Sequence, residues 1–415
     1  MKDPNVLIIG GGVIGVSTAY YLARAGVDVT LVDGKSIAAG SSWGNAGLIC
    51  PNHSEPIPGP GVLSQGLKWL LDADSPFYIQ PRLDPGLIRW LWRFRGYCNH
   101  QSQERAIPIL RDMQRASLAL YRQIISSEHI RCDFQDVGGV LAFRTQTALQ
   151  AGVAHARRMA DFGLALDVLD AKEIHDLEPA LHPEVKGGVY HQEDAFLTPH
   201  KFVSGLAQAA QRLGVTILEG VEAQGFARAN KRVTTVWTNQ GDMHPRVIVL
   251  AAGIWTTALA RQLDLSIPMQ PAKGYSIGIP RPERAPRKYV IFAERNAVAT
   301  PMGDELRFAG TLELSGLNAN INHRRVNAIR KAAREYLLLP EEIPAGRVWQ
   351  GLRPVPPDGL PYIGRSNQAR NLFVATGHAM LGLSMGPITG KLVSELILSQ
   401  PPSLPLDRFD VERFS

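Results

Sequence analysis

The sequence has few cysteines and no long hydrophobic segment. Its 415 residues include three cysteines, Cys50, Cys98 and Cys132, which are too few for a disulfide framework and lack the spacing of a metal site. No apolar stretch approaches the roughly 20 residues that are needed to cross a bilayer. The first apolar run, at Val6, has neither a basic segment before it nor a small-residue cleavage site after it, so we expect no secretory signal. These absences favour a cytoplasmic protein without a metal site.

Charge is also unremarkable, and internal repeats and low-complexity tracts are missing. The formal net charge is +6, with 20% charged and 45% hydrophobic residues, as in an ordinary globular α/β protein. Basic residues do not gather with interleaved aromatic residues, so we expect no nucleic-acid partner. The length allows two domains, or one domain with large insertions.

The clearest motif lies at the start of the chain. Residues 6–9 form an apolar run of strand length, and Gly10, Gly12 and Gly15 then occupy the three glycine positions of G-x-G-x-x-G. The first glycine permits a tight turn, the second lets a pyrophosphate approach the backbone, and the third lets helix and strand pack closely. The free N–H groups at the start of the following helix would face that phosphate.

A second apolar run at 27–32 ends in Asp33, at the position from which an acid accepts hydrogen bonds from an adenosine ribose. An isolated glycine motif is weak, but here both strands, the helix and the acid have the expected spacing. The unit therefore predicts a dinucleotide site, and at this point it leaves FAD and NAD open.

The C-terminal segment 371–387 favours FAD. It reads as a buried strand, a glycine-rich loop and a helix, more than 300 residues after the first motif. It would return a second helix N-terminus to the cofactor. An isoalloxazine ring needs such donors at its pyrimidine carbonyl, where negative charge accumulates on reduction.

Periodicity and turn residues give a coarse map of the remaining chain. The sequence predicts helices at 66–71, 85–97, 105–127, 147–162, 198–213 and 327–338, and strands at 138–143, 215–221, 232–238, 247–251 and 371–375. The stretch 269–314 reads as strand-rich.

Several motifs follow the order of a known family. They are Ser41–Gly47 (SSWGNAG), Leu197-Thr198-Pro199, Lys273–Ser276 (KGYS), Gly351–Pro354 (GLRP) with Pro357-Asp358-Gly359, and Gly377-His378 with Gly382. Together they span nearly the whole chain. The sequence thereby resembles the FAD-dependent amine and D-amino-acid oxidoreductases, which include D-amino-acid oxidase and glycine oxidase. Within that group it is most similar to the small subunit of bacterial D-amino-acid dehydrogenases.

The resemblance implies an α/β, two-domain flavoprotein. A Rossmann-like FAD-binding domain would be joined to a discontinuous substrate domain whose mixed sheet covers the substrate over the flavin. We expect the FAD-binding domain at 1–80, 150–265 and 345–400, the substrate domain at 81–149 and 266–344, and a C-terminal tail at 401–415.

The same resemblance, with the glycine motifs, implies the cofactor-binding residues. They are Gly10, Gly12, Val13, Ile14, Gly15, Asp33, Gly34, Ser41, Ser42, Asn45, Ala46, Gly47, Leu48, Val221, Gly253, Gly377, His378, Ala379, Met380, Leu381, Gly382, Leu383 and Ser384. We expect His378 to contribute its backbone and not acid–base chemistry.

Three residues are candidates for contact with the substrate. The family counterpart of Arg353 grips the substrate carboxylate, and a guanidinium fork pairs bidentately with a carboxylate; the alternative is an ordinary salt bridge. Tyr275 would hydrogen-bond the substrate over the ring, or it is a half-buried strand tyrosine. His53 would line the active site, or it is a solvated loop histidine.

Departures from the family pattern affect the cofactor and the substrate. Some relatives tether the flavin through a cysteine near the C-terminal glycine loop, or through a histidine near the first one. This chain has no cysteine after Cys132, and Trp43 stands near the other tethering position. We therefore expect non-covalent FAD. Glycine oxidase has an arginine where Met380 stands, which disfavours a glycine-oxidase activity.

Residues 87–95 combine arginines with tryptophans. Such a pattern is typical of a helix that lies on a membrane surface, and also of a helix packed on its own protein. It makes peripheral contact with the inner membrane an open expectation.

The predicted function is the oxidative deamination of a D-amino acid to a 2-oxo acid and ammonia, by hydride transfer from Cα to flavin N5. A membrane quinone is the expected electron acceptor, with O₂ as the other option. Two alternatives stay open: a secondary-amine oxidoreductase acting on D-proline, hydroxyproline, sarcosine or glycine, and an FAD-binding subunit of a heteromeric dehydrogenase. The sequence leaves the stereochemistry, the side chain accepted and the oligomeric state undetermined.

Overall fold

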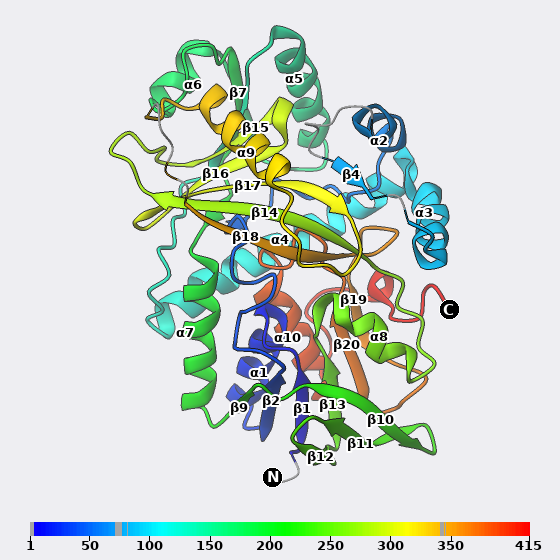
Figure 1. Cartoon of the computed structure of the whole chain (residues 1–415). Coiled ribbons are helices and arrows are strands. Elements are labelled where there is room, and N and C mark those ends of the chain that lie inside the picture. Colours follow the sequence, from blue (N-terminus) through cyan, green and yellow to red (C-terminus); the bar gives the residue numbers. More distant parts are fainter. Residues whose placement is uncertain (1–3, 71–76, 81, 341–343, 345) are drawn as a thin grey trace.

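Two sheets form the framework of the molecule, one in each half. The computed structural model describes residues 4–70, 77–80, 82–340, 344 and 346–415. In Figure 1 the strands β1, β2, β13 and β20 stand in the lower half, and β14, β16, β17 and β18 run across the upper half. The chain passes between the halves several times, as a discontinuous two-domain fold requires.

The lower sheet has six strands and is mainly parallel. Its order is β19-β20-β13-β1-β2-β9, and β19 alone runs antiparallel to its neighbour. The strands are β1 (Val6–Ile9), β2 (Val29–Asp33), β9 (Thr216–Glu219), β13 (Val247–Leu250), β19 (Tyr362–Arg365) and β20 (Leu372–Thr376). Both faces of the central strands are covered, which explains why they read as continuous apolar runs.

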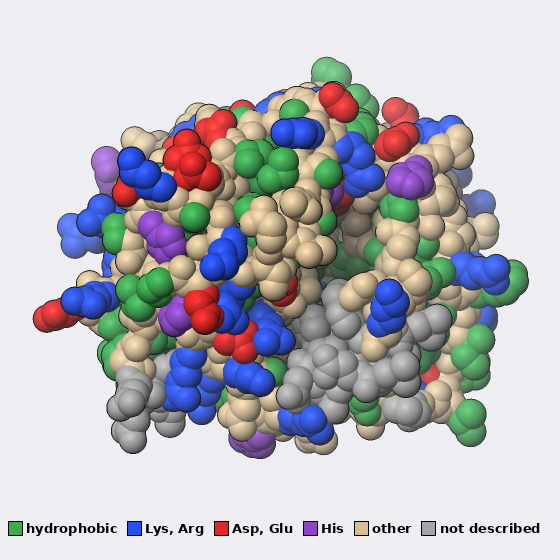
Figure 2. All heavy atoms as spheres, turned by 90° about the horizontal axis from the view of Figure 1, so that it is seen from above, with side chains coloured by type: hydrophobic (Ala, Val, Ile, Leu, Met, Phe, Trp, Pro, Cys, Tyr) green, Lys and Arg blue, Asp and Glu red, His purple; other side chains and the backbone are tan. Residues whose placement is uncertain are grey.

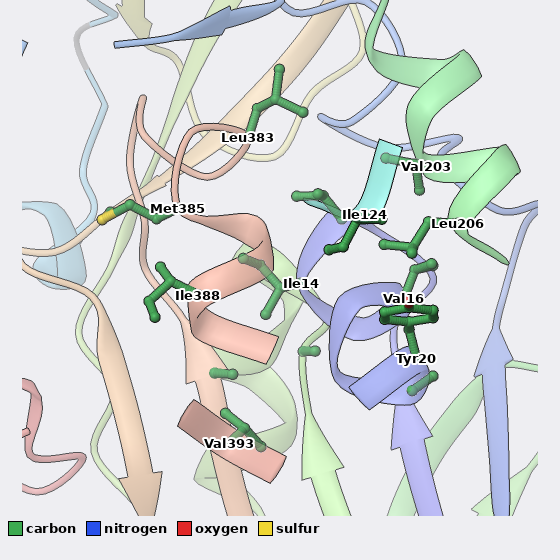
Figure 3. Close-up of a cluster of buried hydrophobic side chains, with 14 of the residues drawn as sticks. Ile14, Val16, Tyr20, Ile124, Val203, Leu206, Leu383, Met385, Ile388 and Val393 are labelled. Atoms are coloured by element: carbon green, nitrogen blue, oxygen red, sulfur yellow. The ribbon is translucent and has the colours of Figure 1, made fainter. Parts of the chain in front are cut away.

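Helices cover one face of this sheet and a small antiparallel sheet covers the other. The helices are α1 (Val13–Arg24), α4 (His100–Ser127), α7 (Pro199–Arg212) and α10 (Gly386–Ile397). Figure 3 shows Ile14, Val16 and Tyr20 of α1 in the core that also holds Leu206 of α7 and Ile388 of α10. The opposite face packs on α8 (Thr256–Arg261) and on β10 (Ala223–Ala229), β11 (Arg232–Thr238) and β12 (Gly241–Met243).

The upper sheet is mixed. Its main path is β18-β14-β17-β16-β15-β5-β7-β6, with β4 paired to β17. The strands are β4 (Phe77–Ile79), β5 (Gly139–Phe143), β6 (Leu166–Leu169), β7 (Gly187–His191), β14 (Gln270–Pro280), β15 (Tyr289–Phe292), β16 (Ala297–Met302), β17 (Glu305–Leu314) and β18 (Arg347–Val355). Helix α9 (His323–Tyr336) packs on one face. The other face turns toward the lower half, because Ser276 and Thr300 bond there to the backbone of Gly44 and Ala46.

The remaining elements lie around these sheets. They are α2 (Val62–Leu70), α3 (Pro85–Tyr97), α5 (Gln146–Ala160), α6 (Ala171–Leu177), the short 3₁₀ helices η1 (Gly253–Trp255), η2 (Ala293–Arg295) and η3 (Asp407–Phe409), and the pair β3 (Leu48–Ile49) and β8 (Ala195–Phe196). Within the described residues, none of the helices combines the length and the apolarity that crossing a bilayer would require. On the face shown in Figure 2, basic and acidic side chains are interspersed.

Sheet membership differs from the expected domain boundaries at four strands. Strand β4 lies within the expected FAD-binding segment 1–80, β6 and β7 within 150–265 and β18 within 345–400, yet all four belong to the upper sheet. The partners of β4, β7 and β18 are distant in the sequence, so local pattern does not indicate this pairing. The tail after 400 is also packed, since Phe409 and Val411 are buried.

Candidate active site

The glycine turn has the close contacts that its motif requires. Gly10 follows β1 with φ +119°, and a Cβ on it would lie 2.4 Å from the carbonyl oxygen of Ala251. A Cβ on Gly15, in the first turn of α1, would lie 1.9 Å from the carbonyl oxygen of Gly10. Side chains are therefore excluded at both positions, which lets the turn after β1 pack closely against α1 and against the end of β13.

Asp33 and Ser42 organise the same turn. Asp33, the last residue of β2, accepts the N–H of Gly11 at 2.7 Å through Oδ2 and the N–H of Lys35 at 2.7 Å through Oδ1. The Ser42 hydroxyl accepts the N–H of Val13 at 3.0 Å. The segment after β2 thus returns to the N-terminus of α1, as the sequence predicts.

Segments that the sequence assigns to the cofactor, though distant in the chain, are joined by hydrogen bonds. Val221 donates its N–H to the carbonyl of Asp33 at 2.9 Å, and Thr376 donates its hydroxyl to the carbonyl of Gly253 at 2.8 Å. The hydroxyl of Ser384 accepts the N–H of Cys50 at 3.0 Å, which joins the C-terminal loop to the segment after Gly47. The structure therefore brings together the segments that sequence motifs assigned to one cofactor.

A buried glutamine that the sequence does not mark as functional joins two of these segments. Gln114 of α4 accepts the Ser384 hydroxyl at 2.7 Å and donates to the Ser54 hydroxyl at 2.9 Å. It also donates to the carbonyl of His53 at 3.2 Å. Its position in a long amphipathic helix gave no local signal, because its partners lie 60 to 270 residues away.

Arg353 lies on the face of the upper sheet that turns toward the glycine segments. It belongs to β18 and pairs with Ala272 of β14. Its guanidinium reaches across Gly274 and donates to the carbonyl of Thr311 at 2.9 Å. No carboxylate of the described part of the chain forms an ion pair with it. Burial lowers the pKa of Arg353 to about 10, so the group is still charged at neutral pH.

Tyr275 is on the opposite face of β14. It is 1% exposed and packs in the core beneath α9, with its hydroxyl donating to Glu313 at 3.0 Å. Because side chains alternate along a strand, Tyr275 faces away from the side that carries Gly274 and Ser276. The structure therefore does not bring Tyr275 to Arg353, and it favours the reading of a buried strand tyrosine.

His53 lies in the loop after β3, beside a buried carboxylate. Its Nδ1 is 3.6 Å from Oδ2 of Asp194, and its ring lies tilted by 45° against that of His191, with centroids 4.7 Å apart. Cys50 joins this group, because its sulfur lies within 4.8 Å of the ligand atoms of His53 and Asp194. The sequence could not indicate this cluster, since Asp194 is far away in the chain. The expectation of no metal site stays a prediction.

His378 is buried under the C-terminal loop. Its Nε2 lies 3.0 Å from the hydroxyl of Thr389 in α10, and burial lowers its pKa to about 3. The imidazole is therefore neutral at physiological pH. It acts as a packing group, and the neighbouring Ala379 donates its N–H to Pro354 next to Arg353.

The donor set fits a dinucleotide flavin. Glycines at 10, 12 and 15 put backbone without side chains at the N-terminus of α1, and a glycine turn of this kind suits a pyrophosphate. The loop 377–384 before α10 lies beside the strand that carries Arg353, because the N–H of Ala379 bonds to the carbonyl of Pro354. This combination of a glycine turn, a second glycine loop and a covering mixed sheet defines a flavin-dependent oxidoreductase.

Comparison with known proteins gives the same class. Residues 5–396 match the family model of FAD-dependent oxidoreductases, and the chain belongs to this family. A D-amino acid dehydrogenase of Paramagnetospirillum magneticum is 34% identical over 419 residues, 99% of both chains, and one of Bradyrhizobium diazoefficiens is 32% identical over 421 residues, again 99% of both. The glycine oxidase of Geobacillus kaustophilus shares the fold, with a TM-score of 0.78, 21% identity and full coverage of both chains.

Proposed function

We propose that this protein oxidises a D-amino acid to a 2-oxo acid and ammonia, with non-covalently bound FAD. The observation that carries the proposal is the charged guanidinium of Arg353, which has a backbone carbonyl as its hydrogen-bond partner and faces the cofactor segments. A guanidinium with free N–H groups in such a place matches a planar carboxylate. The names of the full-length relatives support an amino acid as the substrate.

The chain's own residues would bind and orient the substrate. Arg353 would hold the carboxylate and fix the direction of Cα, while the backbone of 10–15 and 42–48 would hold the cofactor with the loop 377–384. When bound, FAD supplies the acceptor for the Cα hydride. The imine product then leaves and is hydrolysed. A substrate with a neutral amine needs no side-chain base, so orientation and charge stabilisation carry the catalysis.

The proposal includes a quinone-type acceptor and contact with a membrane surface. Helix α3 supports it, because its outer side exposes Ile88 and Trp92, which are 62% and 73% exposed, next to Arg89 and Arg95. An apolar ridge flanked by cations suits an anionic lipid surface. The protein would then work at the cytoplasmic side of the inner membrane.

The test is anaerobic reduction of the purified yellow protein by a panel of candidate substrates. We expect D-amino acids to bleach the flavin absorbance and their L-enantiomers to leave it unchanged. Bleaching only by secondary amines such as D-proline or sarcosine would replace the proposed substrate class. Bleaching by neither class would make the chain a cofactor-binding subunit. Acid precipitation should release intact FAD, and flavin retained in the pellet would contradict non-covalent binding.

A further inference from the structure

A cavity of about 500 Å³ lies at the far end of the upper sheet, between α5 and the loop after β3. Its wall is apolar and comes from α5 and strands β5, β7 and β15, through Leu141, Phe143, Ala151, Met159, Val189 and Ile291. Asn52, His53 and His191 form a polar end. The volume is in the range of small-molecule sites, which run from roughly 300 to 1,000 Å³.

This cavity is on the same face of the upper sheet as Arg353, but it lies several strands away from that residue. Ala309 of β17 pairs with Val298 of β16, which pairs with Ile291 of β15, which in turn pairs with Leu141 of β5. These side chains therefore share one face of the sheet. The guanidinium of Arg353 reaches β17, and the cavity begins at β15, two strands further on. At about 4.8 Å per strand, the separation is roughly 10 Å or more. A small amino acid held at Arg353 would not fill this cavity.

The polar end of the cavity has unused hydrogen-bonding groups. Asn52 is 6% exposed, and neither its amide oxygen nor its amide nitrogen has a partner within the described residues. The Nδ1 atom of His53 also lacks a hydrogen bond, but it faces Oδ2 of Asp194 at 3.6 Å. Buried polar groups normally find partners, so the Asn52 amide, turned toward the cavity that this residue lines, would suit a ligand that both accepts and donates. An amide can serve a carbonyl through its nitrogen and a hydroxyl through its oxygen.

The charged groups at the rim of the cavity already have ion-pair or hydrogen-bond partners within the protein. Glu55 forms ion pairs with His155 at 2.9 Å and with Arg158 at 3.7 Å, and it accepts from Gln103 at 2.8 Å. Glu294 accepts from the backbone and hydroxyl of Thr145. A charged ligand would therefore meet no uncompensated counter-charge, which favours a neutral ligand with an apolar body.

Protonatable groups stand behind the polar end. The Asp194 carboxylate is fully buried and accepts from the Asn52 N–H at 2.9 Å and from the Tyr289 hydroxyl, and it lies 3.3 Å from Nδ1 of His191. Through Cys50, Ser384 and Gln114 the same loop is bonded to the C-terminal cofactor loop. The cavity is thus next to the cofactor region, and a buried carboxylate lies behind its polar end.

We infer that this cavity binds the electron acceptor, a neutral quinone, with the Asn52 amide at its carbonyl oxygen. The inference rests on the quinone-type acceptor of the proposed function. Two electrons and two protons pass from the two-electron-reduced cofactor to the quinone. Both carbonyl oxygens become hydroxyls, and the cofactor returns to its oxidised form. Asn52 suits both states, because it donates to the carbonyl and accepts from the hydroxyl.

The experiment measures the two half-reactions separately in the FAD-loaded enzyme. The variants are Ala151→Trp, which fills the cavity, and Asn52→Leu, which removes its unpartnered amide. Ala154→Trp is the matched control, because Ala154 is exposed on the same helix and does not line the cavity. The flavin is reduced either by substrate or photochemically without any amino acid. It is then mixed anaerobically with a ubiquinone that carries one isoprene unit, or with a hydrophilic dye.

We expect both cavity variants to slow reoxidation by the quinone at least about tenfold, and to keep reduction by substrate and reoxidation by the dye within twofold of the wild type. The control should match the wild type throughout, and all proteins should keep their FAD. Quinone reoxidation unchanged in Asn52→Leu and in a folded Ala151→Trp overturns the inference. Slower reduction by substrate with normal quinone reoxidation also overturns it, since the cavity would then hold the substrate's side chain.

Photochemical reduction separates this inference from the proposed function. If no amine reduces the flavin but the photoreduced wild type is reoxidised through the cavity, the proposed substrate is wrong and the acceptor site stands. If the amino acid reduces the flavin and no quinone reoxidises the wild type, the acceptor site is wrong and the deamination stands.

Discussion

Gly274 lies directly beneath the guanidinium of Arg353. A Cβ built on Gly274 would stand 2.4 Å from each terminal nitrogen of that side chain. The two residues come from neighbouring strands, β14 and β18, and Gly274 is paired with Gly351 while Arg353 reaches back over it. The absence of a side chain at Gly274 therefore sets the position of the cation that would bind the substrate.

The first prediction concerns the guanidinium itself. Arg353→Lys keeps the charge but loses the bidentate fork. We expect it to lose about 1.5–3 kcal/mol of transition-state stabilisation, the range for hydrogen bonds to charged groups, which lowers kcat/KM roughly 10- to 150-fold. FAD content should be unchanged. Arg365→Lys, at an exposed position of β19, is the control. Unchanged steady-state efficiency of Arg353→Lys would place the carboxylate anchor elsewhere.

The second prediction concerns Gly274→Ala. The new methyl group meets the flexible end of Arg353, so folding should be little affected, while the guanidinium must move out of place. We expect a fall in kcat/KM similar to that of Arg353→Lys, through a higher KM. The midpoint temperature of thermal unfolding should stay within a few degrees of that of the wild type. Gly96→Ala, which meets no atom within 4 Å, is the control. Normal KM in Gly274→Ala would mean that the substrate does not depend on this position of Arg353.

The sequence predicts the structure best where the signal is local. The unit from Val6 to Asp33 folds as predicted, and helix α3 has the predicted bounds of 85–97. Turn glycines and continuous apolar runs carry this information without reference to distant residues. Helix α4 begins at His100, five residues before the predicted start, because Asn99 caps it and Pro108 is accommodated inside it.

Sequence reasoning was weaker where structure depends on pairing across the chain. The sequence does not predict strands β6 and β10, whose partly exposed residues give no clear run or alternation, or β7, which is buried but begins with two glycines. Tyr275 was a candidate for substrate contact, but its place on the strand points it to α9. The cluster of His53 with Asp194 could not be predicted either, because only the fold brings these two residues together.

The third prediction uses the pKa of His378, which burial lowers to about 3 from an ordinary value of 6.5. Between these values the unfolded chain binds a proton that the folded chain does not, so stability is full above pH 6.5 and falls as the pH decreases. At 1.36 kcal/mol per unit, the contribution lost between pH 6.5 and 4 is about 3 kcal/mol.

Urea unfolding of the wild type and of His378→Gln at several pH values tests this. The variant should be less stable at pH 7, where the packed imidazole is missing, and its stability should fall less steeply toward pH 4. His323→Gln, at an exposed position that starts α9, should retain the wild-type slope. Equal slopes for the wild type and His378→Gln would show that another group controls the acid sensitivity.

The last prediction concerns the outer side of α3. Leu87, Trp90 and Phe94 fix the helix to the protein, which leaves Ile88 and Trp92, four residues apart, on the exposed side. Arg95 lies 5.6 Å from the ring of Trp92, so a cation accompanies the apolar ridge. Lipid contact would bury both side chains, at about 1.5–3 kcal/mol for a large apolar residue, and would add a salt-dependent attraction to anionic headgroups.

Sedimentation with vesicles containing phosphatidylglycerol measures this binding. We expect the wild type to sediment with anionic vesicles at low salt and less with neutral vesicles or at 0.5 M salt. The double variant Ile88→Ser, Trp92→Ser should bind at least about tenfold more weakly and keep its reduction by substrate. Trp237→Ser removes a tryptophan that is 45% exposed on β11 and should bind like the wild type. A wild type that stays in the supernatant with anionic vesicles would refute contact through α3. A quinone would then have to reach the cofactor from solution.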